Sequence, residues 1–128
     1  MTARSHDTGE TRRASCHCGT VVLEAYLPQG LGSAQRCNCS FCRRRGAAAV
    51  TARTDRVRVI QGAGALTLYT WGTHTAQHYF CRICGIYTHH RRRKDPAETG
   101  INLGCIDNVL PQDLEPIPTA DGRTNPLA

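Results

Sequence analysis

The chain is short of aromatic residues, of lysine and of long apolar runs. Only 5% of its 128 residues are aromatic and 40% are hydrophobic. A single small core with so few large side chains gains stability from added cross-links, and a bound metal ion can serve as one. No run approaches the roughly 18 consecutive apolar residues of a membrane span, which argues against a membrane protein. The length suits one domain.

The N-terminal segment also lacks the apolar stretch of a secretory signal. Eight cysteines without a visible signal favour a reducing compartment, and we expect the protein to be cytoplasmic. In that setting, clustered cysteines more often bind metal or take part in catalysis than form disulfides.

Seven of the eight cysteines fall into three clusters, and only Cys105 stands alone. The clusters are CxC at Cys16 and Cys18, CxCxxC at Cys37, Cys39 and Cys42, and CxxC at Cys81 and Cys84. Neighbours this close make poor disulfide geometry, whereas zinc favours several thiolates at about 2.3 Å. The sequence therefore predicts metal pockets.

The seven thiols divide naturally into a set of four and a set of three. Structural zinc sites take four ligands, and catalytic sites keep three and an open position. The CxC and CxxC clusters can together form one four-thiolate site, with the ligands Cys16, Cys18, Cys81 and Cys84. The central residues Cys37, Cys39 and Cys42 then form a three-thiolate site.

Two interpretations of the three-cysteine site stay open on the residues alone. Cys105, His89 or His90 could close it as a second structural site, or its fourth position could stay open for chemistry. Because side chains alternate along an extended backbone, we expect His17 and Asn38, between paired cysteines, to face away from the metal.

The net charge is +6, and Lys94 is the only lysine among the 16 basic residues. Arginine runs occur at residues 43–45 and 91–93. They suit a small anionic substrate, a phosphate backbone, or a solvated surface that balances anionic zinc–thiolate centres. Basic runs alone do not establish nucleic-acid binding, which we therefore do not expect.

Short β-branched segments separated by glycine predict a mainly β domain. The expected strands include residues 20–27, 47–52, 55–60, 66–71 and 101–106. No helical apolar period stands out. We expect a disordered leader at residues 1–14, a zinc-binding domain at 15–118 and an extended tail at 119–128.

At its cysteine motifs the sequence resembles the glutathione-dependent formaldehyde-activating enzyme family, also called the centromere protein V-like family. The matching segments are 15–19, 37–43, 80–92 and 102–107, and the resemblance extends over residues 15–118. It implies the β-tent fold, with short antiparallel sheets stapled by zinc. It implies two zinc ions per chain: a structural ion on Cys16, Cys18, Cys81 and Cys84, and a catalytic ion on Cys37, Cys39 and Cys42.

The resemblance also implies a carbon–sulfur lyase, similar to S-hydroxymethylglutathione synthase, which adds a glutathione-like thiol to formaldehyde or a related aldehyde. The expected partners are thus a small thiol and an aldehyde, without a membrane. Three thiolates weaken the Lewis acidity of zinc, so we favour capture of the thiol over activation of the carbonyl. Arg43 is the candidate that binds the anionic thiol through forked hydrogen bonds. Many members carry histidine where this chain has Asn38.

The alternative function is a zinc-stapled β binding module whose basic face contacts nucleic acid or an acidic partner. Salt dependence separates the two hypotheses, because binding through phosphate contacts weakens steeply as salt rises. The sequence leaves the oligomeric state open.

Overall fold

The structure is a computed structural model that describes residues 9–123, and it is mainly β, as the sequence predicts. The strands are β1 (Glu10–Ser15), β2 (Val22–Leu27), β3 (Arg36–Cys37), β4 (Ala49–Arg53), β5 (Val57–Gln61), β6 (Leu66–Tyr69), β7 (Gln77–Cys81), β8 (Tyr87–Arg91), β9 (Glu98–Asn102) and β10 (Thr119–Ala120). The single α-helical turn in these residues is α1 (Cys42–Arg45). None of their helices is long and apolar enough to cross a membrane.

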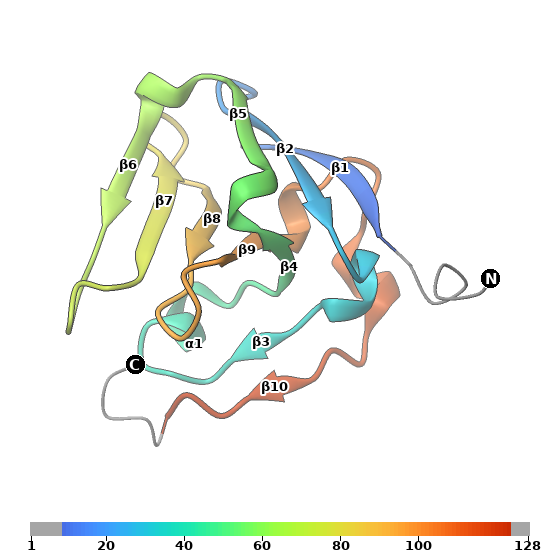
Figure 1. Ribbon diagram of the computed structural model, residues 1–128, viewed down its shortest axis with the longest axis vertical. Coiled ribbons are helices and arrows are strands. Elements are labelled where there is room, and N and C mark those ends of the chain that lie inside the picture. Colours follow the sequence, from blue (N-terminus) through green and yellow to red (C-terminus); the bar gives the residue numbers. More distant parts are fainter. Residues whose placement is uncertain (1–8, 124–128) are drawn as a thin grey trace.

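Two antiparallel sheets and one short parallel ribbon make up the fold. One sheet has the order β1-β2-β5 and the other β4-β9-β8-β7-β6, while β3 pairs in parallel with β10. In Figure 1, β5 leads into β6 across the top of the molecule, and the β3–β10 ribbon runs along the bottom. The segments that carry the cysteine clusters are thereby distributed over both sheets and the ribbon.

The hydrophobic core lies between the sheets and consists mostly of small aliphatic side chains. Leu23 and Leu27 from β2 meet Val50 from β4 and Ile101 from β9, and Leu103 is also completely buried. On β2 the buried positions alternate with more exposed ones after Leu23, as expected for a strand with one face on the core. Few large residues contribute, which agrees with the low aromatic content.

The structure corrects the predicted leader at residues 1–14. Residues 10–15 form β1, which pairs with β2 from Glu10↔Leu27 to Ser15↔Val22. Polar residues are tolerated there because β1 is an edge strand, and its first four side chains alternate between exposed and half-buried. Residues 1–8 lie outside the described part of the chain.

The tail and the last predicted strand also differ from the sequence prediction, while the other expected strands shift at their ends by one or two residues. The tail expected from residue 119 begins with β10 and so belongs to the domain, while residues 124–128 are not among those described. The strand expected at 101–106 begins earlier, at Glu98, because it pairs with β4 from Arg53 onward. It ends at Asn102, whose side chain accepts a hydrogen bond from the Gly104 amide at 3.1 Å and starts a 3₁₀ turn.

His89 on β8 is a buried neutral side chain. Its ring stacks on Tyr79 with 4.7 Å between centroids, and its Nδ1 lies 2.8 Å from the Thr88 hydroxyl. Burial lowers the pKa of His89 to about 4. Between that value and the ordinary pKa near 6.5, the unfolded chain binds a proton that the folded chain does not, so stability falls as the pH falls.

We therefore expect the substitution His89→Gln to reduce the loss of stability on acidification. Between pH 7 and 5, one such histidine costs about 1–2 kcal/mol of unfolding free energy, which the variant does not lose. Urea denaturation of both proteins at each pH measures the difference. Equal pH dependence of the two proteins would contradict the assignment.

Candidate functional site

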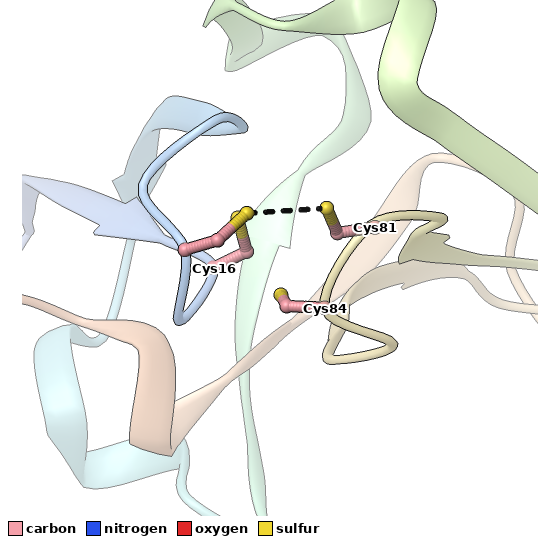
Figure 2. Close-up of side chains that lie close together, drawn as sticks. Cys16, Cys81 and Cys84 are labelled. Atoms are coloured by element: carbon pink, nitrogen blue, oxygen red, sulfur yellow. Dashed lines mark hydrogen bonds between the residues drawn. The ribbon is translucent and has the colours of Figure 1, made fainter.

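The first candidate centre joins two loops that are distant in the sequence. Cys16 and Cys18 lie on the turn after β1, and Cys81 and Cys84 lie at the end of β7 and in the following turn. Their four sulfurs lie within 4.8 Å of one another. Figure 2 shows Cys16, Cys81 and Cys84 pointing toward one another from the two loops.

The spacing of these sulfurs fits a tetrahedral zinc site. Thiolates at about 2.3 Å from zinc stand about 3.8 Å apart in a tetrahedron. The sulfur of Cys18 lies 3.6 Å from that of Cys16 and 3.8 Å from that of Cys81. Backbone hydrogen bonding at Cys18 lowers the pKa of Cys84 to about 6, which favours the thiolate form. The donor set can therefore hold zinc.

The second candidate centre is the CxCxxC segment. Cys37 ends β3, Cys39 follows in a bend, and Cys42 begins α1, with all three sulfurs within 4.8 Å of one another. The Cys42 amide donates to the Cys39 sulfur at 3.2 Å, and the Cys39 amide donates to the Cys37 sulfur at 3.5 Å. Amide donors of this kind stabilise thiolates, so these residues also fit a metal ion.

No fourth histidine, cysteine or carboxylate from residues 9–123 joins the three-cysteine cluster. Cys105 is buried elsewhere and directs its thiol toward the Tyr87 carbonyl at 3.4 Å. His89 and His90, the other residues considered as closing ligands, are likewise absent from the cluster. The polypeptide described here thus supplies three ligands at this centre.

A cavity of about 370 Å³ opens beside the three-cysteine cluster. Its wall includes all three cysteines, the aromatic residues Phe41 and Trp71, and the histidines His78 and His90. Five basic residues also line it: Arg36, Arg45, Arg92, Arg93 and Lys94. Glu115 and Glu98 pair with two of these, Arg36 at 2.9 Å and Arg92 at 3.1 Å.

Arg45 contacts the cluster directly. Its Nη2 donates to the Cys42 sulfur at 3.7 Å, and its guanidinium lies over the rings of Tyr87 at 3.7 Å and Phe41 at 4.6 Å. Its Nε is buried without a hydrogen-bond partner. None of the ion pairs found within residues 9–123 includes Arg45. A half-buried guanidinium that is in none of these ion pairs is suited to stabilise anions at this centre.

The structure does not bring Arg43 to the cavity. Arg43 is exposed on α1 and is absent from the cavity wall, whereas Arg45, two residues later, lines it. Residues three apart lie on the same face of a helical turn, so Arg45 lies on the face of α1 that carries Cys42. The CRRR run alone does not show which arginine faces the cavity, because no apolar period marks the helical turn.

Two histidines complete the wall next to Arg45. Arg45 Nη1 lies 3.2 Å from His78 Nδ1, and because arginine only donates, that nitrogen accepts and the proton resides on Nε2. Burial, assisted by Arg45, lowers the pKa of His78 to about 4. His78 stacks on His90 at 5.2 Å, and His90 Nδ1 lies 2.6 Å from the Tyr87 hydroxyl. No motif in the sequence had singled out His78.

Comparison with known proteins agrees with this arrangement. A family model described as glutathione-dependent formaldehyde-activating enzyme matches residues 11–120. The crystal structure of a Rhodobacter sphaeroides protein, a structural genomics target, is similar with a TM-score of 0.83 and 54% sequence identity. The similarity covers 84% of this chain and 99% of that one.

Proposed function

The chain belongs to the glutathione-dependent formaldehyde-activating enzyme family, and we propose that it catalyses zinc-dependent addition of a small glutathione-like thiol to formaldehyde or a related aldehyde. That family supports a carbon–sulfur lyase at the level of enzyme class. In the reaction, a sulfur–carbon bond forms as the carbonyl π bond breaks, and the proton lost by the thiol ends on the oxygen. The main support is a three-cysteine cluster that opens on a cation-lined cavity.

We assign different roles to the two centres. The four-cysteine centre joins the loop after β1 to the loop after β7, which follow strands of different sheets, and this suits a structural zinc ion. The three-cysteine centre suits the catalytic ion, for which Cys37, Cys39 and Cys42 are the ligands. Zinc held by Cys37, Cys39 and Cys42 would lower the pKa of an added thiol and so favour its thiolate form.

The basic residues of the cavity then act on the anionic substrate. Arg45 stabilises negative charge on the incoming sulfur, because its guanidinium lies beside Cys42 and has no carboxylate partner among the ion pairs described. Arg93 and Lys94 on the cavity wall suit the carboxylates of a glutathione-like thiol. We therefore propose Arg45 for the substrate-binding role, where the sequence suggested Arg43.

His78 is our candidate for a hydrogen-bond donor to the aldehyde oxygen. Its Nδ1 accepts from Arg45, which fixes the protonated Nε2 as a hydrogen-bond donor on a neutral ring. A neutral imidazole that lines the cavity can stabilise the negative charge that develops on the aldehyde oxygen, while the proton lost by the thiol reaches that oxygen through the solvent.

A small-molecule substrate is favoured over nucleic acid as the partner of the basic run. Arg92, Arg93 and Lys94 line the same cavity as the three cysteines and are not spread over a flat face. A cavity of about 370 Å³ is of the size that holds small ligands.

We expect the purified protein to contain about two zinc ions per chain. The substitution Cys39→Ser should remove about one ion and leave the fold intact, while Cys81→Ser should remove the structural ion and unfold the domain. Elemental analysis and circular dichroism measure these outcomes, with Cys105→Ala as the control that keeps both ions. Retention of both ions by Cys39→Ser would show that the three-cysteine centre is wrongly assigned.

We expect Arg45→Met to lower kcat/KM for glutathione and formaldehyde about tenfold or more, since charge-assisted hydrogen bonds contribute about 1.5–3 kcal/mol. NMR exchange spectroscopy measures the rate of adduct formation above the uncatalysed background. The control is Arg43→Met, which removes an exposed arginine from the same helical turn. Equal losses in both variants, or no zinc-dependent rate in the wild type, would contradict the proposal.

A further inference from the structure

We propose that Asn38 and Gly122 are positioning residues, which hold residues 119–123 as a strap across the three-cysteine centre and so form one wall of its cavity. The strap is defined here as residues 119–123, beginning with β10. Its residues Ala120, Asp121 and Gly122 line the cavity. The proposal rests on the function proposed above, because it assumes that this centre holds the catalytic ion.

Asn38 fastens the strap through both its side chain and its backbone. Its Oδ1 accepts hydrogen bonds from the Gly122 amide at 2.7 Å and from the Arg123 amide at 2.9 Å. Its own amide donates to the Ala120 carbonyl at 3.2 Å. Because β10 and β3 pair over only two residues, the side-chain bonds extend a short ladder by two further contacts.

The position of Asn38 explains why its hydrogen bonds to the strap also affect the cysteines. Asn38 lies between Cys37 and Cys39, so its backbone also sets the spacing of these two ligands. Its side chain is hydrogen-bonded to the strap. Fixing the strap therefore fixes the peptide that carries both thiols.

Gly122 sets how closely the strap approaches the cluster. A Cβ added at this residue would lie 2.6 Å from the Cys37 sulfur and 3.1 Å from Cys39 Cβ. Real Cβ atoms do not approach a sulfur so closely, so any larger residue forces the strap or Cys37 to move. The glycine is thus required by the close approach of a backbone to a ligand atom.

The test compares four variants of the full-length zinc-loaded protein. Asn38→Ala removes the acceptor and Asn38→Asp retains it, whereas Gly122→Ala adds the obstructing methyl group. Gly32→Ala is the matched control, since an added Cβ there meets nothing within 4 Å. Two quantities are measured: hydrogen exchange of the amides in residues 119–123, and the rate at which a chelator removes zinc from the three-cysteine centre.

We expect Asn38→Ala to lose amide protection at Gly122 and to release zinc from this centre about tenfold faster, the lower end of the effect of residues that support metal ligands. Asn38→Asp should restore the protection. Gly122→Ala should accelerate zinc release, and Gly32→Ala should match the wild type. The zinc of the four-cysteine centre should be unaffected throughout.

If the strap amides of Asn38→Ala kept wild-type protection from exchange, Asn38 would not hold the strap. If that protection were lost while the rate of zinc release stayed unchanged, Asn38 would not position the cysteines. Both results are distinct from failure of the proposed function. Should the wild type show no turnover or no zinc at the three-cysteine centre, the assigned chemistry fails, while the exchange of the strap amides still decides whether Asn38 holds it.

Discussion

The convergence of four cysteine thiols from two distant loops is the constraint on which the fold depends. Cys18 and Cys81 are 63 residues apart in the sequence, yet their sulfurs lie 3.8 Å apart. One loop follows β1 in the three-stranded sheet and the other follows β7 in the five-stranded sheet. A core built mostly of alanine, valine and leucine gives limited burial energy, so a metal held here would add stability where the packing supplies little.

Charge balance links this scaffold to the chemistry proposed at the other cluster. Three thiolates around a divalent ion leave one negative charge, and the guanidinium of Arg45 beside Cys42 offsets it. The same guanidinium favours a neutral His78 and lies over the Tyr87 ring. In the function that we propose, one arginine would thus offset the charge of the ligands, add to the effect of burial on His78 and attract an anionic thiol.

The sequence predicted the two cysteine centres and the mainly β fold, because ligand spacing and strand patterns are local properties. It did not predict β1, since a polar edge strand looks like a leader until its partner is known. It suggested Arg43, whereas Arg45 is the arginine of this turn that lines the cavity, because the facing depends on a single helical turn without an apolar period. The role of residues 119–123 was missed because their partners, Cys37 and Asn38, lie more than 80 residues away.

The near absence of lysine has a chemical consequence for the cavity. Aldehydes condense with unprotonated amines, as in the Schiff bases that lysine forms with carbonyl compounds, whereas guanidinium stays protonated and does not react in this way. Four of the five cations on the wall are arginines, and Lys94 is exposed. For a protein that handles formaldehyde, as we propose, this choice of cation provides positive charge while leaving a single side-chain amine open to self-inactivation by the aldehyde.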